Sequence, residues 1–221
     1  FSKRHPGMTI EDGYRIGRAW VALEKAAGKK VIGHKIGLTS RAMQISSQID
    51  EPDYGTLLDD MLYTAQAGEV LEIPVKNFIA PRVEVELAFV LKAPLAGPNV
   101  TVEDVLAATE YIVPSIELID SRIRNWKIGL VDTIADNASS AGVILGAGRV
   151  RPSDIDIGGI SAVLFEDGVE IARGEASAVL GNPTKAVAWL ARTVAAFGVR
   201  LEAGHVILPG SCTRAIDVHA G

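Results

Sequence analysis

The feature that most constrains this chain of 221 residues is residues 81–91, an apolar run that carries two glutamates two positions apart. Valine, leucine and phenylalanine dominate the run, which predicts a β-strand. Side chains alternate between the two faces of a strand, so Glu84 and Glu86 share a face, with Arg82 beside them. Neighbouring carboxylates repel each other, and such a pair either faces water or holds a cation. The run alone leaves both alternatives open.

A third carboxylate, Glu117, lies in a second apolar run at residues 111–119. An unpaired carboxylate in a protein interior costs several kcal/mol, so Glu117 needs a partner. One alternative is an arginine such as Arg122 or Arg124. The other is a divalent cation shared with the two glutamates of the first run. Three carboxylates without a cluster of histidine or cysteine suit a hard ion such as Mg²⁺ or Mn²⁺.

Composition narrows the class of protein. The 48% hydrophobic content is enough to bury a core, and one domain is expected at this length. A net charge of −5 and the lack of a basic stripe argue against a nucleic-acid partner. No apolar run is long enough to cross a membrane, the first residues do not resemble a signal peptide, and the single cysteine, Cys212, fits a reducing compartment. We therefore expect a cytoplasmic protein that acts on a small molecule.

Two polar side chains stand out before the first glutamate run. Lys35 lies in a predicted strand, residues 29–40, where a lysine either binds a carboxylate or anionic ligand or extends to water. Its neighbour His34 points to the opposite face and is expected to be structural. Asp53 follows Pro52 in a predicted turn or loop, where it either forms the turn or acts as a positioned acid or base.

Two later segments are candidates for ligand contacts. Asn137 and Ser139 lie among small and hydrogen-bonding residues, which either form a helix-packing surface or reach a polar ligand. Near the end of the chain a predicted buried strand, residues 204–209, leads into a Gly-Ser loop with Ser211 and Thr213. Such a loop can present N–H groups and hydroxyls to an anion, although a bare turn is equally common.

Periodicity, capping residues and turn residues predict the remaining elements. Helices are expected at residues 9–28, 39–44, 101–109 and 182–198, strands within 68–74, 111–120 and 143–145, and a hairpin at 161–174.

Several motifs occur together in one order: GHKIGLTS at 33–40, EPDYGTLLDDM at 51–61, PRVEVE at 81–86, DNAS at 136–139, GNP at 181–183 and GS at 210–211. In this combination the chain resembles, over nearly its whole length, the hydratase/decarboxylase branch of the fumarylacetoacetate hydrolase superfamily. The resemblance implies an α+β fold, a mixed β-sheet roll or sandwich with peripheral helices. It also implies a single domain, residues 1–221. This domain consists of an N-terminal helical segment at about 8–28 and a β-roll catalytic core at about 29–221.

The resemblance also implies the chemistry of the site. The implied residues are Glu84, Glu86 and Glu117 for Mg²⁺ or Mn²⁺, Lys35, Asp53 and Ser139 for catalysis, and Arg82, Leu58, Ser211 and Thr213 for substrate binding. The implied activity is addition of water to a 2-oxo or 2-hydroxydienoic acid in meta-cleavage catabolism of aromatic compounds. The expected substrate is 2-oxohept-4-ene-1,7-dioate, which would give 4-hydroxy-2-oxoheptanedioate. A homo-oligomer, either a pentamer or a decamer, is implied as well.

In the expected mechanism Lys35 and Asp53 act as an acid–base pair, because a nearby cation lowers the pKa of a lysine. Three other functions stay open: decarboxylation of a 4-oxalocrotonate-type 2-oxo-3-enedioate, hydration of 2-hydroxypenta-2,4-dienoate, and a non-catalytic partner subunit of a hydratase/decarboxylase complex. A second substrate carboxylate would need a cation, for which Arg41, Arg82 and Arg214 are candidates. The family's chains run on into a further strand, so we expect this chain to be incomplete at its C-terminal end.

Overall fold

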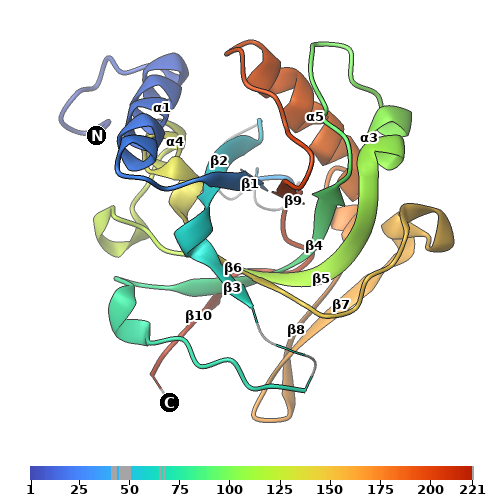
Figure 1. The fold of residues 1–221 in the computed structure, drawn as a ribbon. Coiled ribbons are helices and arrows are strands. Elements are labelled where there is room, and N and C mark those ends of the chain that lie inside the picture. The colour runs from blue at the N-terminus through green and yellow to red at the C-terminus, as the bar shows by residue number, and fades with distance from the viewer. Residues whose placement is uncertain (41–43, 45–50, 65, 67, 221) are drawn as a thin grey trace.

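The computed structural model describes residues 1–40, 44, 51–64, 66 and 68–220. Its centre is a mixed β-sheet that curls into a roll, with helices packed on the outside (Figure 1). The strands follow the order β2-β1-β9-β4-β5-β6-β3, and β10 pairs with β4. Their bounds are β1 (Val31–Gly37), β2 (Asp53–Leu58), β3 (Leu62–Thr64), β4 (Arg82–Leu91), β5 (Thr109–Ile119), β6 (Ser140–Leu145), β9 (Val206–Leu208) and β10 (Ile216–Asp217).

The antiparallel pair β4–β5 forms the middle of the sheet. Its register runs from Arg82 opposite Ile119 to Leu91 opposite Thr109. β9 lies between β4 and β1, antiparallel to β4 and parallel to β1. A strand from late in the chain therefore joins the lysine strand to the glutamate strand, and brings the predicted site residues of both into one sheet.

Helices cover the outer face of the sheet, and a hairpin forms a second, two-stranded sheet. The bounds are α1 (Ile10–Ala26), α3 (Val102–Ala108), α4 (Leu130–Ala135), α5 (Pro183–Ala195), β7 (Ser161–Glu166) and β8 (Val169–Glu175). Thr9 and Thr101 cap α1 and α3, each in a capping box with an aspartate three residues later. Asn182 caps α5, with proline in the first turn. Among the described residues, no helix has the length and apolar character needed to cross a membrane.

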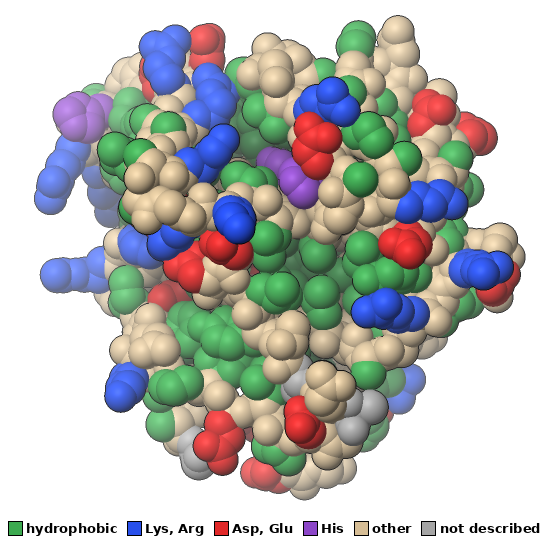
Figure 2. All heavy atoms as spheres, in the orientation of Figure 1, with side chains coloured by type: hydrophobic (Ala, Val, Ile, Leu, Met, Phe, Trp, Pro, Cys, Tyr) green, Lys and Arg blue, Asp and Glu red, His purple; other side chains and the backbone are tan. Residues whose placement is uncertain are grey.

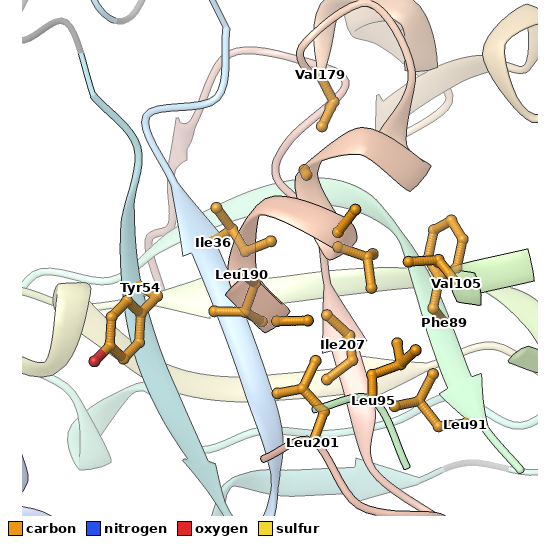
Figure 3. Close-up of a cluster of buried hydrophobic side chains, with 14 of the residues drawn as sticks. Ile36, Tyr54, Phe89, Leu91, Leu95, Val105, Val179, Leu190, Leu201 and Ile207 are labelled. Atoms are coloured by element: carbon orange, nitrogen blue, oxygen red, sulfur yellow. The ribbon is translucent and has the colours of Figure 1, made fainter. Parts of the chain in front are cut away.

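The two faces of the sheet bury different clusters. On the outer face, Phe89 and Leu91 of β4 pack with α3 and α5, and Ile36 and Tyr54 belong to the same cluster (Figure 3). On the inner face, Ala88 of β4 packs in a second cluster whose buried members all come from strands. Strand alternation therefore places the even-numbered positions of β4, including both glutamates, inside the roll.

Most predicted elements are confirmed, including the α+β roll, and two predictions are wrong. The segment from Asp53, expected to be a turn or loop, is strand β2, because its backbone pairs with β1. The strand expected within residues 68–74 is not a strand. Its short apolar stretch lies between Gly68 and Pro74 and pairs with no strand among the residues that the structure describes. Residues 41–43, half of the short helix expected at 39–44, lie outside the described residues.

Candidate active site

Three glutamates on the inner face of the roll come together. Glu84 and Glu86 lie two residues apart on β4, and Glu117 on β5 is the direct cross-strand partner of Glu84. One carboxylate oxygen from each residue lies within 4.8 Å of the other two. Glu117 is fully buried, Glu86 is 1% exposed and Glu84 is half-buried. The register of one strand pair therefore assembles an acidic cluster, which is named here the glutamate cluster.

The glutamate cluster offers oxygens that have no hydrogen-bond partner. Oε1 of Glu86 and both carboxylate oxygens of Glu117 lack a partner, whereas Oε2 of Glu86 accepts a hydrogen bond from the Gly210 N–H at 2.8 Å. Lys35 Nζ lies 3.4 Å from Oε1 of Glu117. One positive charge beside three acids, two of them buried, leaves excess negative charge. A donor set made of oxygen alone suits a hard divalent ion. The residues present fit Mg²⁺ or Mn²⁺.

Burial and mutual repulsion control protonation of the cluster. Burial, reinforced by the charges of Glu117 and Glu84, raises the pKa of Glu86 well above its ordinary value. Burial also raises the pKa of Glu117 to about 8, although Lys35 acts against it. The pKa of Glu84 is raised by burial in the same way. The cluster therefore favours a bound positive charge, which a proton or a metal ion can supply.

Lys35 on β1 points into the same site. Its Nζ donates a hydrogen bond to the carbonyl oxygen of Ala138 at 3.0 Å, beside the ion pair with Glu117. Burial lowers the pKa of Lys35, but the neighbouring carboxylates, with Glu117 and Asp53 foremost, outweigh burial and raise it. We expected a nearby cation to lower this pKa. The charges of the chain itself act in the opposite direction and keep Lys35 protonated.

Asp53 opens β2 directly beside Lys35. It pairs with Gly37 of β1, is 2% exposed, and its Oδ1 has no hydrogen-bond partner. A Cβ at Gly37 would lie 2.2 Å from Asp53 Oδ1 and 3.4 Å from Lys35 Nζ. Only glycine at this position leaves room for the Asp53 carboxylate. Burial raises the pKa of Asp53, and Lys35 opposes this shift.

Ser139 is placed by a strained turn, η4 (Asn137–Ser139). The φ angles of Asn137, Ala138 and Ser139 are 55°, 52° and 56°, a left-handed conformation that costs roughly 1–2 kcal/mol per non-glycine residue. Asn137 anchors the turn to β2: its Oδ1 accepts from the Thr56 N–H at 2.8 Å, and its Nδ2 donates to the Thr56 carbonyl at 2.9 Å. The turn presents the Ala138 carbonyl to Lys35 and leaves the Ser139 hydroxyl buried without a partner. Strain of this kind concentrates at functional sites.

The terminal loop lies against β4 beside the glutamate cluster. Gly210 contacts Glu86, and the Ser211 hydroxyl donates to the Val85 carbonyl at 3.3 Å. The Thr213 hydroxyl donates to a backbone carbonyl within the loop at 3.2 Å. The structure therefore brings this loop to the edge of the site through Gly210, while the hydroxyls of Ser211 and Thr213 contact backbone.

The predicted substrate residues Arg82 and Leu58 differ in position. Arg82 begins β4 on the face that carries Glu84, with its side chain 33% exposed. Its Nε donates to Asp217 at 2.7 Å and its guanidinium lies 4.5 Å from the centre of the Trp126 ring. Leu58 is fully buried at the end of β2, and strand alternation turns it away from the face that carries Asp53.

Among the described residues, none of the other arginines named from the sequence forms an ion pair with Glu117. The arginine partner considered for Glu117 is wrong, since Glu117 pairs with Lys35 and Arg122 pairs with Asp136 at 2.6 Å. Arg214 donates to the Ile171 carbonyl at 3.1 Å. Arg41 lies outside the described residues.

Sequence reasoning missed two groups at the site. Ser115 is the cross-strand partner of Glu86, and its buried hydroxyl has no hydrogen-bond partner. Its position two residues before Glu117 was the available signal, because that spacing puts both side chains on one strand face. The Gly210 N–H was missed as well, since no sequence pattern indicates which backbone donor reaches a given carboxylate.

Comparison with known proteins identifies relatives of the chain. No protein-family model matches the chain. The chain is 50% identical over 223 residues to the 2-oxo-hept-4-ene-1,7-dioate hydratase of Escherichia coli, across 98% of this chain and 82% of that protein. It is 44% identical over 217 residues to the 2-hydroxyhexa-2,4-dienoate hydratase of Comamonas testosteroni, across 98% and 81%.

A solved structure has the same fold as this chain. The 4-oxalocrotonate decarboxylase from Pseudomonas putida G7, complexed with magnesium and adipate, superposes with a TM-score of 0.93 and 35% sequence identity, over 100% of this chain and 82% of that one. The fold is that of this decarboxylase, and the hydratases at 44–50% identity over nearly the whole chain show that the chain is a hydro-lyase. The chain belongs to the fumarylacetoacetate hydrolase superfamily, in its branch of hydratases and decarboxylases.

Proposed function

We propose that the chain is a divalent-metal-dependent hydratase that adds water to 2-oxohept-4-ene-1,7-dioate and forms 4-hydroxy-2-oxoheptanedioate. The observation that carries the proposal is the meeting of three glutamates and Lys35 in one buried site. The choice of substrate is supported by the 50% identical relative from Escherichia coli, which bears the name of this activity. The cellular setting that follows is aromatic catabolism.

Glu84, Glu86 and Glu117 would hold the metal ion. The related decarboxylase was solved as a complex with magnesium, which supports Mg²⁺ as the ion. When bound, a divalent cation polarises the C2 oxygen of a 2-oxo acid and fixes the adjacent carboxylate. The oxygens of Glu86 and Glu117 that lack partners are the groups in this chain that such an ion would satisfy.

Lys35 and Asp53 are the groups that we assign to proton transfer. A proton leaves C3 of the substrate and another arrives at C5, which moves the double bond from C4–C5 to C3–C4. Water then adds at C4, and the proton that balances it ends on C3. Lys35 serves as the proton donor, because the surrounding carboxylates keep it charged. Asp53, whose Oδ1 has no partner, accepts the proton that leaves C3 and returns it to C3 when water adds. Lys35, neutral after it has given its proton to C5, regains a proton from the attacking water.

Ser139 and Ser115 are the groups that we assign to positioning. Both hydroxyls are buried on the inner side of the roll and have no hydrogen-bond partner. A hydroxyl can donate to a substrate oxygen and accept from water, so either group can orient the attacking water molecule.

A second candidate function is decarboxylation of a 2-oxo-3-enedioate. The observation that favours it is the solved decarboxylase, which superposes over the whole chain. Incubation of the purified chain with Mg²⁺ and each substrate separates the two functions. Hydration leaves all carbon in a 4-hydroxy-2-oxo product seen by mass spectrometry, whereas decarboxylation releases CO₂. Release of CO₂ from the enedioate without hydration of the heptenedioate would overturn the proposal.

We also infer that the chain works as a homo-oligomer, a pentamer or a decamer as the family resemblance implies. Support comes from Phe165 and Val169 on the β7–β8 hairpin, which are 59% and 64% exposed and would be covered by another copy. A mass of 23.4 kDa for the particle in light scattering would contradict this inference.

A further inference from the structure

A second cavity lies on the opposite side of β1 and β2 from the glutamate cluster. It has a volume of about 590 Å³ and is bordered by α1, by the outer face of β1 and β2, and by residues 198–205 after α5. Figure 2 shows the hollow beside α1, with histidine at its floor. Cavities of roughly 300–1,000 Å³ are typical of sites that bind small molecules.

Three polar atoms at this cavity have no hydrogen-bond partner. They are Nδ1 of His34, the hydroxyl of Tyr54 and one terminal nitrogen of Arg18. Burial raises the pKa of Tyr54 and the nearby Arg18 guanidinium opposes this rise, but no hydrogen bond with good geometry joins the two side chains. His34 is 3% exposed and Tyr54 is 8% exposed, so neither side chain is well hydrated. Arg18 is held in place by the Phe197 ring, whose centre lies 4.1 Å from the guanidinium carbon. Buried polar groups nearly always have partners, so three such atoms at one cavity point to a ligand rich in acceptor oxygens.

The charge and the walls of the cavity define the chemistry of that ligand. The charged residues at its border are Arg18, Lys25 and Arg200 against Glu202, an excess of positive charge that favours an anion. Burial, with a smaller effect of His205, lowers the pKa of His34 to about 3, so its ring is neutral and can donate a hydrogen bond.

The remaining wall is apolar and flat. The rings of Tyr14 and Tyr54 stack with centroids 4.6 Å apart and an interplanar angle of 17°. Val21, Ile134 and Val199 complete the apolar lining. A ligand that suits both ends of the cavity carries a carboxylate on a planar apolar body.

The cavity is separated from the active site by the sheet itself. His34 and Lys35 are consecutive on β1, and Tyr54 and Asp53 are consecutive on β2. Side chains alternate along a strand, so His34 and Tyr54 face the cavity while Lys35 and Asp53 face the glutamate cluster. A molecule in the cavity therefore cannot reach the three glutamates.

We propose that this cavity is a second ligand site, which binds a small carboxylate with an aromatic or conjugated body. Arg18 and His34 donate to the carboxylate, Tyr54 adds a third donor, and the tyrosine rings with the aliphatic wall enclose the apolar part. This site does not depend on the reaction assigned to the chain.

Titration calorimetry with benzoate tests the proposal on the full chain, in buffer with a chelator so that no metal is available at the glutamate cluster. We expect benzoate to bind, and benzyl alcohol, which lacks the charge, to bind at least about tenfold more weakly. Arg18→Gln should weaken benzoate binding by about tenfold or more for the same reason. Arg15→Gln is the matched control, because Arg15 is exposed on α1 and pairs with Glu11 at 3.1 Å away from the cavity.

Two further variants keep the result interpretable. Val21→Phe should abolish binding by filling the cavity without removing a polar partner, which covers the case that Arg18→Gln does not fold. Lys35→Met, on the active-site face, should bind benzoate like the wild type. Three results would overturn the proposal: no binding to the wild type at millimolar benzoate, equal binding by Arg18→Gln and Arg15→Gln, or loss of binding in Lys35→Met.

Discussion

Glu84 and Glu117 are direct partners across the antiparallel pair β4–β5, so their carboxylates leave the same face of the sheet side by side. Two acids opposite each other destabilise a strand pair when nothing compensates their repulsion. Here Glu86 adds a third acid two residues along, and Lys35 supplies the nearest positive charge. The strand register that assembles the site is therefore unfavourable in itself. A bound cation would offset the repulsion between the carboxylates.

Glu86→Gln should abolish high-affinity metal binding and leave the protein folded. The change removes one metal ligand and one buried negative charge. Loss of a residue that merely supports a metal ligand lowers metal affinity by about 10- to 100-fold, so loss of the ligand itself should lower the affinity for Mn²⁺ by more than about 100-fold. The unfolding midpoint in urea with chelator should rise or stay the same, because repulsion within the cluster decreases. Glu110→Gln, at an exposed position of β5, is the control. Full turnover by Glu86→Gln in chelator would contradict the metal site.

Lys35→Met should lower kcat by roughly 10²-fold or more, the usual contribution of a general acid or base. Methionine keeps most of the side-chain volume, so the loss reflects the missing ammonium group and not a cavity. Metal affinity should be retained or increased, since a positive charge 3.4 Å from Glu117 is removed. Stopped-flow turnover together with Mn²⁺ titration separates these effects. A near-normal kcat would reduce Lys35 to a structural role.

Gly37→Ala should lower kcat, whereas the same substitution at Gly148 should not. The added Cβ would lie 2.2 Å from Asp53 Oδ1, so the carboxylate must move away from Lys35. We expect kcat to fall by at least about tenfold, because misplaced acid–base groups transfer protons poorly. Gly148→Ala is the matched control, since nothing lies within 4 Å of a Cβ at that position. Equal activity of the two variants would show that the Asp53–Lys35 approach is unimportant.

Arg82→Gln should change the KM for one class of substrate more than it changes kcat. Arg82 shares a strand face with Glu84 and Glu86, about 7 Å from Glu84 along β4, so it can meet the far carboxylate of a seven-carbon diacid. A hydrogen bond to a charged group contributes roughly 1.5–3 kcal/mol, so KM for the diacid should rise about 10- to 100-fold. KM for a monocarboxylic dienoate should stay unchanged. Asp217→Asn, which removes the negative charge of the present partner of Arg82, should not raise KM for the diacid.

The glutamate cluster could be predicted from sequence because its spacing encodes its geometry. Glu84 and Glu86 needed only strand alternation, and Glu117 stood out as a charge in an apolar run. Lys35 was likewise indicated as a charge in a predicted apolar strand. The strand that begins at Asp53 could not be predicted, since its hydrogen bonds come from pairing with β1 and its sequence carries the turn residues Pro52 and Gly55.

The turn that holds Ser139 was also beyond sequence reasoning. Three left-handed residues in a row contradict local preference, and they persist because Asn137 forms two hydrogen bonds to Thr56, which lies 81 residues earlier in the chain. A Cβ on Gly55 would lie 2.3 Å from the Asn137 carbonyl oxygen, so this contact explains why a glycine occupies the middle of β2. Local patterns cannot reveal a conformation that depends on such a distant contact.

His34 should make the stability of the protein depend on pH in the acidic range. Burial lowers its pKa to about 3 in the folded state, against 6.5 in the unfolded chain. Between these values the unfolded chain binds the extra proton, so the stability from neutral His34 is complete above pH 6.5 and is lost as pH falls. The slope approaches 1.4 kcal/mol per pH unit well below pH 6.5. The raised pKa values of Glu86 and Glu117 change stability in the same pH range, so the informative quantity is the difference between two proteins. In urea unfolding, the wild type should lose roughly 1 kcal/mol more stability between pH 7.5 and 5.5 than His34→Gln does. His219→Gln, at an exposed position, is the matched control. An equal drop in the wild type and in His34→Gln would exclude His34 as its source.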